Sequence, residues 1–150
     1  MAFTLGKPGN QAAIPSYGDI LGMIYMMNPA IASLVSAGAA EVLTGFQIGE
    51  GIFVRSGATV AVTVTTDTAT NIINALGPNT YAGQSFMMIY VNLNTASGAV
   101  TLAPGTGVTL SGTTSVPIAG VRFYIGTVTS TTTPAVTIQG AFAVGSGVTA

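Results

Sequence analysis

The clearest pattern along the chain is a regular alternation of apolar and polar residues in its second half. Residues 58–66 alternate strictly, with Val60, Val62 and Val64 on one side and threonines and alanines on the other. A period of two predicts a β-strand with one buried face. Residues 84–93 alternate as well, but both sides are largely apolar, which predicts burial on both faces. In a chain this small, one face would lie in the core and the other at a subunit interface.

Further strands are predicted where short apolar runs are separated by glycine, proline and threonine. These runs are residues 42–48, 51–55, 100–102, 108–110, 121–128 and 135–142. Two of them have the same sequence, Val-Thr-Leu, and a short Pro- and Gly-containing segment separates them. This arrangement predicts a β-hairpin.

One short helix is predicted between the two alternating strands. Asp67 or Thr68 can cap its start, because short oxygen-bearing side chains accept hydrogen bonds from the first free backbone N–H groups. Apolar residues Ile72, Ile73 and Leu76 then recur at helical spacing, and the following Gly-Pro pair ends the helix.

The first 41 residues have a different texture. The apolar run 20–35 is shorter than the ~20 residues that cross a membrane, and Asn28-Pro29 interrupts it. Small residues at 37–40 give it some likeness to a signal peptide, but Lys7 is the only positive charge before it. We favour one or two short helices, broken at Pro29, that pack on a partner or on the β domain.

Together these segments predict a mainly β fold. We expect a small antiparallel barrel or sandwich, jelly-roll-like, with one short helix, preceded by an apolar N-terminal arm with short helical pieces. The expected organisation is an arm at 1–41 that binds a partner or a neighbouring subunit, a β domain at 42–143 and a C-terminal tail at 144–150.

Charge is almost absent from this chain. Its 150 residues include three Lys or Arg and four Asp or Glu, so 5% are charged, against about 25% in an ordinary soluble domain. A nearly neutral surface favours association, so we expect a subunit of an assembly. There is no basic patch for nucleic acid, and the absence of His and Cys excludes imidazole and thiolate metal sites.

Catalytic chemistry finds little support in the remaining residues. A serine or threonine nucleophile needs a base, and Lys7 is the only lysine. Glu41 and Glu50 lie near Arg55, which predicts a salt bridge within or between chains more readily than a hydrolytic carboxylate pair. The glycines of 105–112 lack the spacing of a nucleotide loop. We therefore expect no catalytic residue, no cofactor site, no metal site and no small-molecule substrate.

Interface residues are the more promising candidates. Arg122 is the only charge after Asp67, and it lies on a predicted strand, where it is either a solvent-facing rim arginine or an interface arginine. The methionines of the arm offer an adaptable apolar surface, or plain core. The complete candidate set is Met23, Met26, Met27, Glu41, Glu50, Arg55, Phe86, Met88, Tyr90, Arg122 and Tyr124.

Residues 58–140 resemble a known family. The order is an alternating Thr/Val strand, a helix ending Ile-Ile-Asn-Ala-Leu, Gly-Gln-Ser-Phe at 83–86, the segment 101–112 with its Gly-Thr-Gly-Val-Thr-Leu core, Arg-Phe at 122–123, and a late Ala-Val-Thr-Ile. It is similar to the β domain of tailed-bacteriophage capsid decoration, or cement, proteins. The resemblance implies a homotrimer on the outer surface of the capsid, made in the host cytoplasm, that binds the major capsid protein and stabilises the head. The arm at 1–41 would then bind the capsid or a neighbouring decoration subunit.

Alternatives from other classes remain at this point. The chain could be another structural virion subunit, such as a head fibre, a tail or spike-base subunit, or a minor capsid protein. An enzyme or a carbohydrate-binding module would need clustered aromatic residues around a polar cleft, whereas the chain has five scattered Tyr and no Trp. A membrane-associated coat subunit would use residues 20–35, and we consider a membrane partner the weaker expectation.

Overall fold

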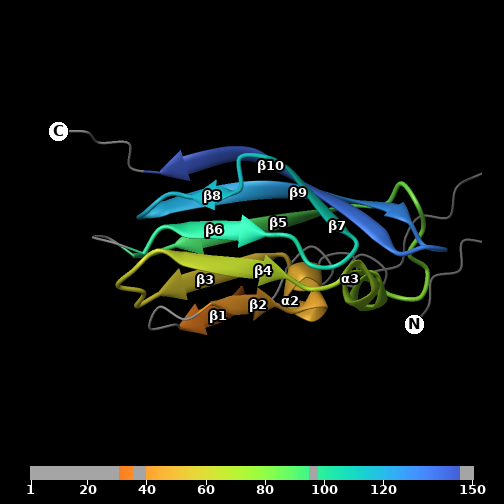
Figure 1. Ribbon diagram of the computed structural model, residues 1–150, viewed down its shortest axis with the longest axis horizontal. Helices are drawn as coiled ribbons and strands as arrows, with labels where there is room; N and C mark the ends of the chain where they lie inside the picture. The colour runs from red at the N-terminus through yellow and green to blue at the C-terminus, as the bar shows by residue number, and fades with distance from the viewer. Residues whose placement is uncertain (1–30, 36–39, 95–97, 146–150) are drawn as a thin grey trace, which may run out of the picture.

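Two β-sheets packed face to face form the body of the protein (Figure 1). The computed structural model describes residues 31–35, 40–94 and 98–145. The six-stranded sheet has the order β1 (Ile31–Val35), β3 (Ile52–Ser56), β5 (Ser85–Asn92), β9 (Gly120–Ser130), β10 (Ala135–Gly145), β7 (Val108–Gly112). The four-stranded sheet has the order β2 (Glu41–Leu43), β4 (Val62–Thr66), β6 (Val100–Ala103), β8 (Ser115–Val116). The predicted mainly β sandwich is confirmed, and the barrel alternative is not, since the two sheets do not close on each other.

From β1 to β8 the chain alternates between the two sheets. Each strand returns to its own sheet after one strand in the other, so neighbours such as β1, β3 and β5 run parallel. Strands β2, β4 and β6 are parallel for the same reason. The predicted antiparallel pairing is therefore right only for β5–β9, β9–β10 and β6–β8, and both sheets are mixed.

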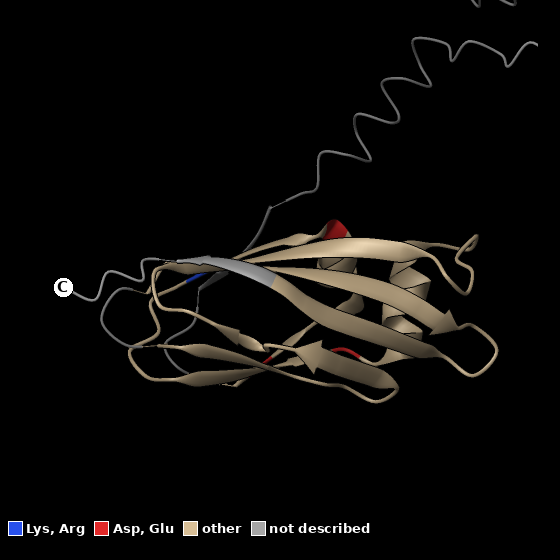
Figure 2. Ribbon diagram, turned by 90° about the horizontal axis from the view of Figure 1, so that it is seen from above, with Lys and Arg blue, Asp and Glu red and all other residues tan. Residues whose placement is uncertain are grey.

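Two helices among the described residues carry the chain from the four-stranded to the six-stranded sheet. Helix α2 (Gly45–Glu50) joins β2 to β3, and α3 (Ala69–Leu76) joins β4 to β5. Seen from above, they lie between the two sheets at one end of the sandwich (Figure 2). The predicted helix α3 is confirmed, because the Thr68 side chain accepts a hydrogen bond from the backbone of Asn71 and the helix ends at Leu76.

Helix α2 was not expected. The strand predicted at 42–48 is right only at its start, where β2 ends at Leu43. Thr44 then caps a helix, and the Gln47 side chain accepts the Thr44 backbone N–H in return. This reciprocal capping box satisfies two backbone donors at once, and it turns an apolar run that looked like a strand into a helix.

Asp67 connects the starts of the two helices. One carboxylate oxygen accepts the Gly45 backbone N–H at 2.7 Å, and the other accepts the Thr68 N–H and the Asn71 side chain, both at 2.8 Å. Burial acts to raise the pKa of Asp67, but the hydrogen bonds from Asn71, Gly45 and Thr68 outweigh it, so the pKa is below its usual value. The helices approach closely here, since a Cβ added to Gly45 would overlap the Asn71 backbone.

Two further expectations are wrong. The Val-Thr-Leu segments do not form a hairpin, because β6 pairs with β4 and β8 whereas β7 pairs with β10. The intervening segment crosses between the sheets, and there the Gly105 N–H donates to the Thr66 hydroxyl at 2.8 Å. In the arm, Ile31–Val35 form edge strand β1 instead of a helix, whereas the helical pieces expected earlier lie outside the described residues.

The core lies between the sheets. Its aromatic members are Phe53, Tyr90 and Tyr124, and the first two rings pack at 5.7 Å between centroids. Phe86 packs at its margin, directly against Gly126, where any side chain would overlap the ring. The other buried apolar side chains are Leu43, Ile48, Ala58, Val62, Val64, Ala69, Ile72, Met88, Val100, Leu102, Val108, Val116, Val128, Val136 and Ile138.

Candidate interaction surface

Charged side chains connect the two sheets inside the protein. Arg55 on β3 is fully buried, and its Nη1 lies 3.0 Å from Oε2 of Glu41 on β2 in the opposite sheet. The Glu41 side chain is 24% exposed, so the ion pair reaches the surface on one side only. Such a pair is strongly coupled to folding, because removing one partner leaves an uncompensated buried charge.

The surroundings of Arg55 make that dependence stronger. Its Nε and Nη2, and the hydroxyl of Tyr90, are buried without a hydrogen-bond partner in the part of the chain that the structure describes. Burial raises the pKa of Tyr90, and the nearby Arg55 charge acts against this rise. Glu41 is thus the one carboxylate of the described residues that balances the buried guanidinium.

Two residues of β9 make similar connections. The Tyr124 hydroxyl donates to the Thr114 carbonyl at 3.1 Å, and Arg122 Nε donates to the Ser115 carbonyl at the start of β8. Burial raises the pKa of Tyr124, which keeps its hydroxyl neutral and able to donate. Both side chains therefore join the six-stranded sheet to the four-stranded sheet within one chain.

These contacts change the set of interface candidates. Arg55, Met88, Tyr90 and Tyr124 are buried within a single chain, so they are not on a surface that another chain could touch. Glu41, Phe86 and Arg122 are partly buried and also face the interior. Glu50, the last residue of α2, is partly exposed. Met23, Met26 and Met27 lie outside the described residues.

A buried asparagine pair, which the sequence did not single out, closes the end of the sandwich away from the helices. Asn94 Nδ2 donates to Asn92 Oδ1 at 2.7 Å, and Asn94 Oδ1 accepts the Ala58 N–H at 2.9 Å. Asn92 Nδ2 donates to the Gly98 carbonyl at 3.1 Å. A detectable signal was present, since Asn92 is a polar residue on the same strand face as Met88 and Tyr90.

The outer face of the six-stranded sheet is apolar over β3 and most of β5 and β9, and it is polar over β7 and β10, where Thr109, Ser111, Thr137 and Gln139 face outward. Three of its large apolar side chains are about half exposed: Met87 at 58%, Leu93 at 54% and Ile125 at 49%. Strand pairing sets Met87 beside Ile125. We call this surface the aliphatic face. It consists of outward residues of β3, of β5 and the residue after it, and of β9: Ile52, Val54, Met87, Ile89, Val91, Leu93, Val121, Phe123 and Ile125.

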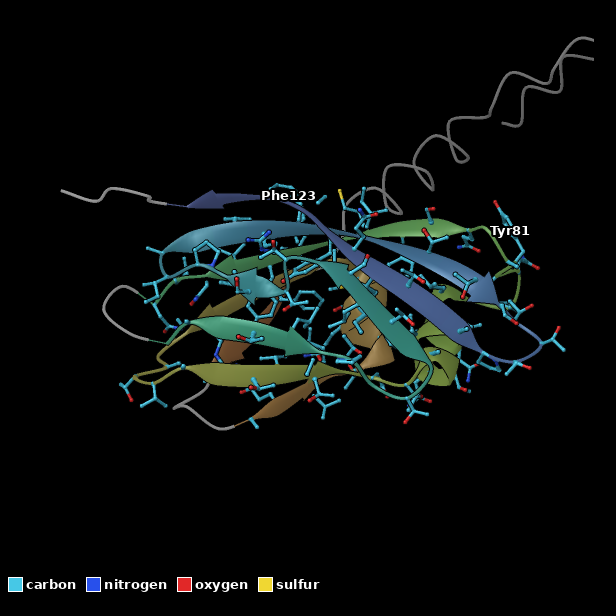
Figure 3. The ribbon with its side chains drawn as sticks, turned by 45° about the horizontal axis from the view of Figure 1, so that its top comes forward. Tyr81 and Phe123 are labelled. Atoms are coloured by element: carbon cyan, nitrogen blue, oxygen red, sulfur yellow. The ribbon has the colours of Figure 1, made fainter. Side chains whose placement is uncertain are left out.

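Figure 3 shows Phe123 on this side of the molecule, away from the four-stranded sheet, whereas Tyr81 lies on the loop that enters β5. The aliphatic face carries no charged side chain, and Figure 2 shows how few positions of either sheet do. The strand predicted at 84–93 is confirmed as β5, and one of its apolar faces is buried, since Met88 and Tyr90 enter the core. Met87 and Leu93 on the other face are exposed, and their burial at a subunit interface stays a prediction.

A hollow lies at one end of the aliphatic face. It has a volume of about 210 Å³ and is lined by Val91, Asn92, Leu93, Ala119, Gly120 and Val121. Ala119 holds a left-handed backbone conformation with φ of 47°, and its N–H donates to the Asn94 carbonyl at 2.7 Å. The buried asparagines thus fix the rim of a mainly apolar depression.

The four-stranded sheet has a different outer face. Strand pairing places Thr63 beside Thr101 and Thr101 beside Ser115, in one row of exposed hydroxyl side chains. The neighbouring row consists of Val42, Thr65 and Ala103. We call this surface the hydroxyl face. It is uncharged like the aliphatic face, but its side chains can hydrogen-bond to water.

The described residues hold no group of three or more His, Cys, Asp or Glu that could bind a metal ion. Neither helix in that part of the chain is long and apolar enough to cross a membrane. Comparison with protein-family models, with curated proteins and with solved structures gives no match to this chain.

Proposed function

We propose that this chain is a non-enzymatic structural subunit of a virion, which decorates and stabilises a bacteriophage head by binding the major capsid protein as a homo-oligomer. The observation that carries the proposal is the internal use of charge. Of the five charged side chains in the described residues, Glu41, Arg55, Asp67 and Arg122 all contact groups of their own chain. The described surface is left nearly free of charge.

Such a surface suits a subunit that covers a shell in many copies. Copies that lie side by side experience no long-range repulsion, because neither outer sheet face carries a charge. Buried area then determines binding, and the apolar part of the surface supplies it. The sequence resemblance to capsid decoration proteins supports the same assignment.

Binding to heads tests the proposal directly. The full chain is added to purified expanded shells of the major capsid protein encoded in the same genome, and the shells are sedimented. We expect the chain to sediment with the shells at a fixed ratio, to saturate, and to raise the temperature at which the shells fall apart.

Two results would overturn the proposal. One is the absence of saturable binding to shells. The other is a chain that immunogold labelling of intact virions places on the tail and not on the head, which would assign it to another class of structural subunit.

A further inference from the structure

We propose that the aliphatic face of the six-stranded sheet is the surface through which copies of this chain bind one another, with the hollow beside Leu93 as its anchor. This inference rests on the proposed function, because it names the surface that makes the homo-oligomer. Its starting point is the exposure of Met87, Leu93 and Ile125, three large apolar side chains on one sheet face.

The aliphatic face is the centre of the outer surface of the six-stranded sheet, and the outward residues of β7 and β10 beside it are polar. The whole outer surface, with its apolar centre and polar rim, has the size that an interface needs. Six strands about 4.8 Å apart and about seven residues long, at about 3.3 Å per residue, present about 700 Å² in projection. A stable interface of standard size buries about 800 Å² on each partner, and side-chain relief adds area to the projection. One face of this sheet is therefore large enough to hold two copies together.

Charge favours a copy of the same chain over a charged partner. The aliphatic face has no Lys, Arg, Asp or Glu, so it offers nothing to a basic or acidic surface. A second copy brings a surface that is equally free of charge, and no ion must be desolvated when the two meet.

The hollow gives the interface a fixed point. It is lined mainly by apolar groups, and Val91, Leu93 and Val121 belong both to the hollow and to the aliphatic face. Binding energy concentrates where a side chain enters a pocket that excludes water. We therefore place the centre of the interface at this end of β5 and β9, with an apolar side chain of the other copy in the hollow.

The test compares two pairs of charges placed on opposite sheets of the full chain. Met87 and Ile125 are cross-strand neighbours on the aliphatic face, and Thr63 and Thr101 are cross-strand neighbours on the hydroxyl face. We expect the Met87→Lys/Ile125→Lys variant to dissociate to monomers in sedimentation velocity, with association weakened at least tenfold. The Thr63→Lys/Thr101→Lys variant should keep the mass of the unaltered oligomer. Circular dichroism melting checks that both are folded.

The outcomes separate this inference from the proposed function. If the aliphatic-face variant keeps its mass, the inference is wrong. If this variant keeps its mass but no longer binds shells, the aliphatic face binds the capsid protein and not another copy. If it keeps its mass and still binds shells, the proposed function is unaffected. Monomers that form as expected while the unaltered chain fails to bind shells support the inference and remove the proposed function.

A cysteine variant decides whether the chain covers its own face. The chain has no Cys, so Met87→Cys introduces a single thiol. We expect maleimide to label it slowly in the oligomer and at least tenfold faster after dilution to monomers. A thiol that stays protected in the monomer would assign the face to another segment of the same chain and overturn the inference.

Discussion

The two outer faces of the sandwich have the same geometry but differ in the chemistry of their central positions. Both are built from every second residue of paired strands, and both lack charge. On the four-stranded sheet these positions include Thr63 and Thr101, whose hydroxyls bond to water; on the six-stranded sheet they include Met87 and Ile125, which cannot. Each Å² of aliphatic surface removed from water stabilises by about 25 cal/mol. A low charge count therefore says little about whether a surface associates until each residue is assigned to a face.

The largest expected loss of stability follows removal of the ion pair that connects the two sheets. Glu41→Ala leaves Arg55 buried without its carboxylate, so we expect a loss of about 3–5 kcal/mol in the free energy of unfolding. Both outer faces are formed only when the two sheets are packed together. Urea denaturation followed by circular dichroism measures the loss, and Glu50→Ala at the end of α2 is the matched control, expected within about 0.5 kcal/mol of the unaltered chain.

A double variant sharpens this prediction. Glu41→Leu with Arg55→Met replaces the buried ion pair by apolar side chains, and such replacements are often neutral or stabilising. We expect most of the stability lost in Glu41→Ala to return. A double variant that is as unstable as Glu41→Ala would show that the guanidinium makes contacts beyond Glu41 that the fold requires.

An intermediate loss of stability is expected where helices α2 and α3 pack against each other. Gly45→Ala sets a methyl group against the Asn71 backbone, and overpacking of this kind costs about 1–3 kcal/mol. Gly49→Ala, on the same helix, places its methyl group 3.7 Å from the Ala75 carbonyl oxygen, an ordinary contact. It should therefore be neutral or gain up to about 1 kcal/mol from helix propensity. Equal melting temperatures for the two variants would contradict the close helix contact.

A smaller effect, dependent on pH, is expected at Asp67. Because its pKa is lower in the folded protein, its stabilisation is fully present above the unfolded pKa of about 3.9 and is lost as the pH falls through the folded value. We expect Asp67→Asn to cost about 1 kcal/mol at pH 7, as loss of a helix cap does, and the difference from the unaltered chain to shrink between pH 5 and pH 2.

Association behaves differently from folding in the same range. Neither outer face carries a titratable side chain, so the association constant measured by sedimentation should be unchanged from pH 5 to pH 9. A steep pH dependence of association with a folded protein would mean that a charged residue lies at the interface.

The smallest effect on folding is expected from exchanging the chemistry of the two faces. Met87→Thr/Ile125→Thr and Thr63→Val/Thr101→Val alter exposed positions, so each should change the free energy of unfolding by no more than about 0.5 kcal/mol per site. Binding of a hydrophobic dye by the monomer should fall in the first variant and rise in the second. Equal dye binding by both variants and the unaltered chain would show that the two faces do not differ in their affinity for apolar molecules.

Much of the fold is predictable from the sequence, because its strands alternate with period two. The strand at 84–93 and the helix that Thr68 starts follow from local pattern. The pairing of strands does not follow from local pattern. The two identical Val-Thr-Leu segments lie in different sheets, because the segment that contains Gly105 crosses from one sheet to the other. The burial of Arg55 is not predictable from local pattern either, because Glu41 lies opposite Arg55 only after the chain has alternated between the two sheets.

The winding of the chain between the two sheets also bears on how the protein folds. Partners in the parallel ladders are far apart in sequence: Ile31 lies beside Ile52, Ile52 beside Ile89, and Val62 beside Val100. High contact order slows folding, because long loops must close before any pairing stabilises them. The sandwich should therefore form late, in one cooperative step, and expose its aliphatic strands to other chains until that step is over.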